Sequence, residues 1–92
     1  MRKEPQRISV ADGVVFRELG EESVLLHLGT GRYFGLDPVA SRMWSALAEA
    51  GTIEGAVATL AEEYDVGEDR LRRDLQELVE NLAERRLVRL EP

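Results

Sequence analysis

The chain has 92 residues, of which 43% are hydrophobic and 33% charged, so it has room for one domain with a single core. It contains no cysteine and one histidine, which excludes a disulfide framework, a thiolate zinc site and a thiol nucleophile. A formal net charge of −6 argues against a nucleic-acid-binding module, because such modules owe most of their affinity to Lys and Arg. The charge favours a neutral or basic partner instead.

The sequence predicts no targeting or membrane segment. Residues 1–7 form a charged stretch without a following apolar region, so we expect a loose N-terminal arm rather than a signal peptide. No apolar run approaches the roughly 18 residues that a membrane-spanning helix needs. We therefore expect one cytoplasmic domain over residues 1–92, without a membrane partner.

Apolar residues alternate through the first part of the chain, as they do in strands. A short strand is predicted at 8–10, and three more at 14–19, 23–28 and 32–36, joined by glycine-containing turns. The last three strands predict an antiparallel meander in chain order, which leaves the strand at 32–36 on an edge. On the outer face of this sheet we expect Val15, Leu25 and Tyr33, either as a partner surface or beneath the strand at 8–10.

The period becomes helical after Asp37, which supplies an N-cap carboxylate, and Pro38, a favoured first-turn residue. The first helix is predicted to stop at Gly51, and the second to start at Thr52 and reach about Tyr64. The third helix is predicted over 68–86, with a stripe of Leu71, Leu75, Leu78, Val79 and Leu82. Residues 87–90 are typical of a short closing strand. The predicted fold class is α+β, a three-stranded antiparallel sheet followed by three helices, similar to a winged helix-turn-helix.

Catalysis is the function class that the residues support least. His27 stands alone on a strand, without cysteines or clustered carboxylates at ligand spacing, so we interpret it as structural. The stretch 29–31 has neither the lysine nor the following helix of a phosphate-binding loop, so it is interpreted as a hairpin turn. We expect no catalytic residue, metal site or cofactor.

A DNA-binding interpretation rests on the second and third helices, which a short turn joins as in a helix-turn-helix. The third helix would be the recognition helix. It carries five arginines but six acidic residues, a poor balance for a groove lined with phosphates. A DNA-binding regulator of the winged helix-turn-helix type is kept as the alternative function.

The edge strand at 32–36 raises a different possibility. An unpaired edge offers a row of N–H and C=O groups, which proteins normally guard with charges, proline or a bulge. Arg32 is a weak guard, and the residues after it supply none. Either a crossing helix or the C-terminal strand covers this edge, or an extended peptide pairs with it. The residues alone leave both interpretations open.

The order of these motifs resembles a known family. Residues 28–37, with the sequence LGTGRYFGLD, resemble the strand-to-helix signature of PqqD-like domains, the recognition elements for precursors of ribosomally synthesised, post-translationally modified peptides. The end of the third helix resembles the same family through Asp74, Leu75, Leu78, Leu82, Leu87 and Val88. The resemblance covers nearly the whole chain after about Ile8. It is greatest to the free-standing leader-binding proteins of lasso-peptide pathways.

The resemblance implies non-catalytic capture of a precursor's leader segment as an added strand beside 32–36 and over the third helix. Its implied partners are the leader peptide, a transglutaminase-like cysteine protease that removes the leader and, downstream, the ring-closing enzyme. Carried over to this chain, the edge residues are Arg32, Tyr33, Phe34, Gly35 and Leu36.

On the third helix we expect the flank of Asp69, Arg72, Arg73 and Gln76, which lie together at 100° per residue beside Leu71, Leu75 and Val79. Asp69 and Arg73, four residues apart, can pair with each other in the free protein and with charged leader residues in the complex.

Overall fold

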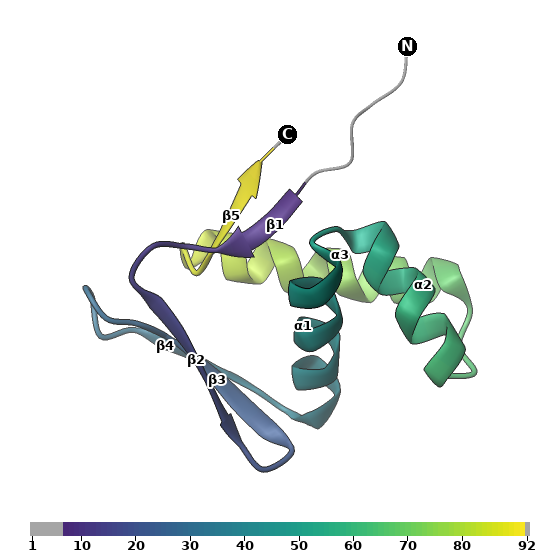
Figure 1. Cartoon of the computed structure of the whole chain (residues 1–92), viewed down its shortest axis with the longest axis horizontal. Coiled ribbons are helices and arrows are strands. Elements are labelled where there is room, and N and C mark those ends of the chain that lie inside the picture. The colour runs from purple at the N-terminus through teal and green to yellow at the C-terminus, as the bar shows by residue number, and fades with distance from the viewer. Residues whose placement is uncertain (1–6, 92) are drawn as a thin grey trace.

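A computed structural model describes residues 7–91, and the whole chain is drawn in Figure 1. The elements are β1 (Arg7–Val10), β2 (Val14–Leu19), β3 (Glu22–His27), β4 (Tyr33–Leu36), α1 (Pro38–Ala50), α2 (Ile53–Glu63), α3 (Glu68–Glu84) and β5 (Val88–Glu91). Every predicted strand and helix is present, which confirms the fold class. Of the predicted N-terminal arm, residues 1–6 lie outside the described residues, and Arg7 already belongs to β1.

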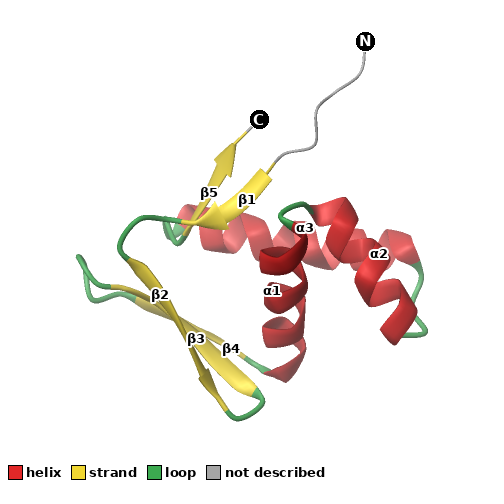
Figure 2. Cartoon of the chain, in the orientation of Figure 1, coloured by secondary structure: helices red, strands yellow, loops and turns green. Residues whose placement is uncertain are grey.

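The strands form two separate sheets (Figure 2). The larger sheet has the order β2-β3-β4, with both neighbouring pairs antiparallel. The smaller sheet is the antiparallel pair of β1 and β5, in which Val10 lies opposite Val88. The C-terminal strand therefore pairs with the first strand and not with β4.

The register of the larger sheet corrects one sequence-based expectation. Leu25 lies opposite Phe16 in β2 and Phe34 in β4, and its side chain is 0% exposed. Leu25 therefore belongs to the inner face, whereas the outer face carries the aligned row of Val15, Leu26 and Tyr33. The alternation of apolar residues did not identify the inner face of β3, because a polar residue, Ser23, also lies on that face. Ser23 is 3% exposed, and its hydroxyl lies 2.6 Å from that of Ser41 on α1.

α1 and α2 begin and end where the sequence predicts, whereas α3 ends at Glu84, two residues short of the predicted end at 86. The Asp37 carboxylate accepts a hydrogen bond of 2.8 Å from the Ala40 N–H at the start of α1. Gly51 ends that helix with a φ of 78°, a left-handed conformation that glycine adopts without strain. The Thr52 hydroxyl then accepts from the Gly55 N–H at 3.1 Å and caps α2. These closely spaced caps fix the direction of α1 and α2 relative to the sheet.

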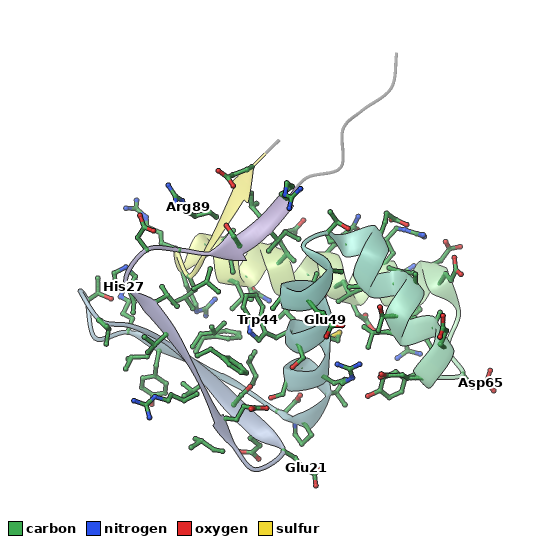
Figure 3. The ribbon with its side chains drawn as sticks, viewed as in Figure 1. Glu21, His27, Trp44, Glu49, Asp65 and Arg89 are labelled. Carbon is green, nitrogen blue, oxygen red and sulfur yellow. The ribbon has the colours of Figure 1, made fainter. Side chains whose placement is uncertain are left out.

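The core lies between the sheet and the helices. Trp44 extends from α1 toward the sheet (Figure 3), is 2% exposed and has its ring 6.4 Å from that of Phe16. The whole predicted stripe of α3 is buried: Leu71, Leu75, Leu78, Val79 and Leu82. Burial at about 25 cal/mol per Å² of apolar surface makes this core the main stabilising term of the fold.

Candidate functional site at the open edge of β4

β4 has a strand partner on one side only. β3 pairs with it along its whole length, and within residues 7–91 no strand pairs with its other edge. The backbone N–H of His27 donates to the carbonyl of Arg32 at 2.8 Å, so position 32 directs its carbonyl toward β3. The backbone bonding direction alternates along an antiparallel strand. The N–H and C=O groups of Phe34 and Leu36 therefore also point toward β3, and those of Tyr33 and Gly35 point toward the open edge.

The side chains of β4 divide between the two faces of the sheet. Phe34 is half-buried and packs against the core on the inner face, and Leu36 is 2% exposed there. Tyr33, on the outer face, is 72% exposed. A Cβ added to Gly35 would have no heavy atom within 4 Å, so the outer face at this position is open. An added strand would meet backbone groups that pair with no other strand among residues 7–91.

The end of α3 reaches β4 through Arg85. Its guanidinium carbon lies 4.8 Å from the centre of the Phe34 ring, a cation–π contact. Arg85 also lines a hollow of about 290 Å³ together with Gly31, Arg32, Tyr33 and Leu87. This hollow, called the edge hollow below, lies beside the first residue of β4.

A second hollow lies at the opposite end of α3. It measures about 280 Å³ and its apolar lining comes from all three helices and the turn before α3: Val39, Met43, Leu60, Tyr64, Val66 and Leu71. Arg70 and Asp74, whose charged groups lie 3.9 Å apart, complete the lining. This apolar hollow lies beside the start of α1, the helix that directly follows β4.

One flank of α3 connects the two hollows. At 100° per residue, Arg70, Asp74, Leu78, Asn81 and Arg85 fall on the same side of the helix. Arg70 and Asp74 line the apolar hollow, and Arg85 lines the edge hollow. We call these five residues the β4-side flank.

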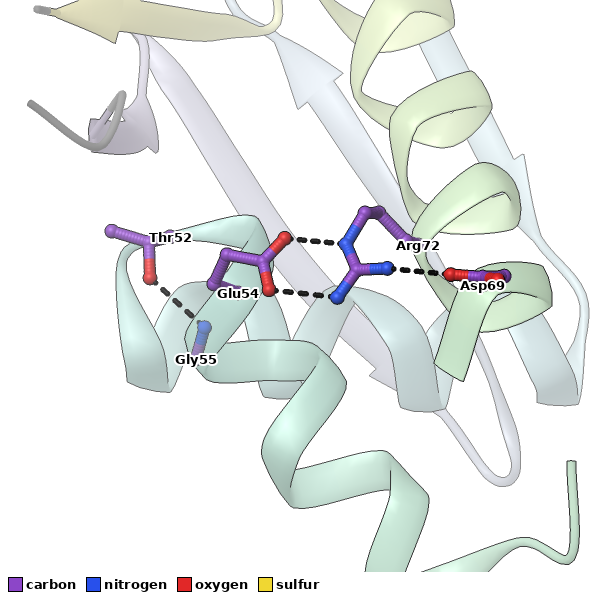
Figure 4. Close-up of polar contacts among 5 residues, drawn as sticks. All are labelled: Thr52, Glu54, Gly55, Asp69 and Arg72. Atoms are coloured by element: carbon purple, nitrogen blue, oxygen red, sulfur yellow. Dashed lines mark hydrogen bonds and ion pairs between the residues drawn. The ribbon is translucent and has the colours of Figure 1, made fainter. Parts of the chain in front are cut away.

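The flank expected from the sequence lies on the other side of α3. Arg72 forms two hydrogen bonds with the Glu54 carboxylate of α2, at 2.5 and 2.9 Å, and a third with Asp69 at 3.1 Å (Figure 4). The Arg72 guanidinium holds the pKa of the Glu54 carboxyl below its usual range, and Glu54 raises the pKa of Arg72. Asp69 therefore pairs with Arg72 and not, as expected, with Arg73. Arg73 and Gln76 are exposed on the same flank, and the structure does not bring these four residues to β4.

The remaining predicted site residues belong to the core. Leu71 is 6% exposed, Leu75 0% and Val79 3%. Leu71 also lines the apolar hollow, whereas Leu75 and Val79 support the surface from beneath. Leu36 supports β4 in the same way. Arg32, Tyr33, Phe34 and Gly35 are the predicted residues that the structure brings together at the open edge. Arg85 and Asp74 were not among the predicted site residues, because the sequence alone does not show which flank of the third helix faces the sheet.

The single histidine stabilises the turn between β3 and β4. His27 Nδ1 accepts hydrogen bonds from the backbone N–H groups of Gly29 at 3.1 Å and Thr30 at 3.3 Å, which close the turn before β4. Across residues 7–91 no group of three or more His, Asp or Glu side chains has a geometry that could hold a metal ion. In the same part of the chain, no helix is long and apolar enough to cross a membrane.

The structure defines a small α+β domain in which, among residues 7–91, one edge of β4 has no strand partner and lies beside the end of α3. Residues 22–88 match the model of the PqqD family, described as coenzyme PQQ synthesis protein D. The chain therefore belongs to the PqqD family. This confirms the family-level resemblance of the sequence.

Two solved structures have closely similar folds. TbiB1, in complex with the TbiA(beta) leader peptide, is 42% identical, with a TM-score of 0.80 over 87% of this chain and 93% of that one. Lasso peptide synthetase B1, complexed with the leader peptide, has the same TM-score of 0.80 at 22% identity, over 90% of this chain and 98% of that one. The second likeness concerns the fold alone. No curated protein sequence matches the chain.

Proposed function

We propose that this protein binds the leader segment of a ribosomally made precursor peptide by strand addition to β4, without catalysing a reaction itself. The observation that carries the proposal is the open edge of β4, where Tyr33 and Gly35 present unpaired backbone groups next to the β4-side flank of α3. The 42% identical TbiB1 was solved with a leader peptide bound, which supports the same class of ligand here.

Backbone pairing alone cannot supply high affinity. Tyr33 and Gly35 together offer four hydrogen-bonding groups, and each bond contributes about 0.5–1.5 kcal/mol. The total of roughly 2–6 kcal/mol falls short of the 8 kcal/mol or so that a micromolar complex needs. Apolar side chains of the leader must supply the rest, and the apolar hollow at Val39, Met43 and Tyr64 is where we place one of them.

The distance between the hollows suits a short extended segment. Asp74 lines the apolar hollow and Arg85, the C-cap of α3, lines the edge hollow. They are eleven residues apart, or about 17 Å along the helix axis. An extended peptide covers that distance with about five residues. The proposed binding surface is therefore the open edge of β4 together with the β4-side flank. Asp69, Arg72, Arg73 and Gln76 are outside this surface.

We further propose that the precursor is of the lasso-peptide class. The resemblance of residues 28–37 and of the end of the third helix to the leader-binding proteins of lasso-peptide pathways supports this assignment. The bound precursor would then pass to a leader-removing cysteine protease and to a ring-closing enzyme. Because these would be separate proteins, this chain needs no nucleophile, metal or nucleotide site of its own.

The test is titration of ¹⁵N-labelled protein with the TbiA(beta) leader peptide, the ligand of the 42% identical relative. The proposal predicts amide shift changes concentrated at β4 and the β4-side flank, and an unchanged peptide mass after prolonged incubation. Changes confined to β1 or α2 would place the site elsewhere. Cleavage or modification of the peptide by this chain alone would contradict the non-catalytic assignment.

A further inference from the structure

Three arginines gather at the end of β4 that is nearest the edge hollow. A hollow of about 740 Å³ between the β3–β4 turn and the end of α3 is lined by Arg32, Arg85 and Arg86, with His27, Thr30 and Glu84. Arg32 and Arg85 also line the edge hollow, so the two spaces adjoin. In a chain with a net charge of −6, three arginines against one glutamate make a locally cationic site. We call Arg32, Arg85 and Arg86 the arginine cluster.

The three residues of the arginine cluster form no ion pair with any carboxylate among residues 7–91. Within residues 7–91 none of the three has a carboxylate within 4.0 Å, although Glu84 lines the same hollow. Arg42 and Arg72, in contrast, each form a bidentate pair with a glutamate of α2. Like charges held near one another raise the energy of the free protein, and an added carboxylate relieves it.

Arg86 occupies a backbone position that normally belongs to glycine. It follows the C-cap Arg85 with a φ of 60°, and is the one non-glycine residue among residues 7–91 with a positive φ. The bond of 2.9 Å from the Leu87 N–H to the Leu82 carbonyl closes the end of α3 around it. Glycine takes this conformation without the steric cost that a side chain pays. The backbone geometry therefore does not explain why this residue is an arginine. A role for its charge would explain it.

Arg85 connects the cluster to the proposed binding edge. Its guanidinium lies on the Phe34 ring, and its Nη1 donates to the Asn81 carbonyl at 3.3 Å. Arg32 directly precedes Tyr33, the first residue of β4 whose backbone groups face the open edge. A peptide paired with Tyr33 would therefore continue past the arginine cluster as it leaves the strand.

We infer that the arginine cluster binds a carboxylate side chain of the leader peptide and fixes the register of the added strand. The inference rests on the proposed function. Guanidinium groups form bidentate bonds with carboxylates, which gives such a contact a defined geometry. Antiparallel pairs outnumber parallel ones, and in an antiparallel arrangement the acidic residue follows the strand-forming residues of the leader.

The test is a charge scan of the TbiA(beta) leader peptide, with glutamate, glutamine or lysine placed at each position in turn and affinity measured by fluorescence polarisation. At one or two adjacent positions, the lysine peptide should bind at least tenfold more weakly than the glutamate peptide. This difference should disappear in the triple variant R32Q/R85Q/R86Q and persist in R17Q, which changes an exposed arginine of β2. A position-specific difference that survives in the triple variant would overturn the inference, as would a scan without any sensitive position.

A second variant separates charge from folding. R86G should raise the midpoint of thermal unfolding, because glycine relieves the left-handed strain, and should still weaken binding of the glutamate peptide severalfold. Unchanged affinity in R86G and in R85Q would remove the cluster from the site.

If the native protein binds none of the peptides, the proposed function itself fails. A contrary outcome is that the native protein retards a 20-base-pair DNA duplex in a gel at physiological salt. If R32Q/R85Q/R86Q abolishes that retardation, the ligand of the cluster is nucleic acid and the inference is wrong.

Discussion

Arg72 of α3 holds the Glu54 carboxylate of α2 through two hydrogen bonds of 2.5 and 2.9 Å. The pair marks the side of α3 that faces α2, whereas the buried stripe of α3 holds the helix in place. The contact of Arg85 with the Phe34 ring marks the flank nearer to β4. The proposed binding surface is placed on that flank.

The Glu54–Arg72 pair predicts a defined dependence of stability on pH. Hydrogen bonding from Arg72 lowers the pKa of the Glu54 carboxyl, so its stabilising contribution is complete above the carboxyl's unfolded value of about 4.5 and is lost as the pH falls through the lower folded value. E54Q should lower the unfolding midpoint at pH 7 by no more than a few degrees, since the pair is exposed to solvent. The difference from native protein should shrink steadily as the pH falls below about 4.5.

Thermal unfolding followed by circular dichroism between pH 3 and pH 7 checks this. E62Q is the matched control, because Glu62 lies on the same helix and has no ion-pair partner among residues 7–91. If E54Q and E62Q gave the same pH profile, the pair would contribute nothing measurable.

The two flanks of α3 can be told apart by adding bulk to each. Asn81 lies on the β4-side flank, and Gln76 on the flank of Arg72; both are exposed. N81W should obstruct a peptide between β4 and α3 and weaken leader binding at least tenfold, about 1.4 kcal/mol. Q76W adds the same side chain on the other flank and should leave affinity unchanged. Calorimetric titration measures both, and a larger loss in Q76W would restore the flank expected from the sequence.

Much of the fold could be predicted because local signals agree with one another. Asp37, Gly51 and Thr52 mark helix ends with residues whose chemistry suits caps, and all three act as caps in the structure. The buried stripe of α3 could be predicted in full because apolar residues that recur every three or four positions are typical of one buried helix face. The position of β4 at a sheet edge also followed, because short turns force a meander.

What could not be predicted depends on contacts between distant segments. The inner face of β3 was misassigned because the buried Ser23 is compensated by Ser41, eighteen residues away, and not by any neighbour. The flank of α3 was chosen on helical geometry alone, which treats both sides of the stripe as equal. Two contacts between distant segments distinguish them: Arg72 pairs with Glu54 of α2, and Arg85 lies on the Phe34 ring of β4.

Tyr33 and Phe34 are neighbours whose truncations should have different consequences. Phe34 packs against the core from the inner face, so F34A should lower the free energy of unfolding by about 2–4 kcal/mol. Y33A removes a side chain that is 72% exposed, and should weaken leader binding while leaving stability within about 0.5 kcal/mol of native. Urea unfolding followed by the fluorescence of Trp44, the single tryptophan, measures stability, and polarisation measures affinity. A destabilised Y33A of unchanged affinity would contradict this division.

The claim that a peptide adds as a strand to β4 depends on the backbone of Gly35. Its N–H faces the open edge and not β3, so G35P removes a donor to the peptide without removing a bond of the β3–β4 ladder. G35A is the matched control: a Cβ here meets no heavy atom within 4 Å, so alanine adds a side chain and keeps the donor. The most direct measurement is the affinity of G35P, G35A and native protein for the TbiA(beta) leader peptide, with circular dichroism confirming that each is folded. We predict near-native binding by G35A and at least a tenfold loss of affinity in G35P. A folded G35P that binds the peptide as tightly as G35A would show that the peptide does not pair with β4.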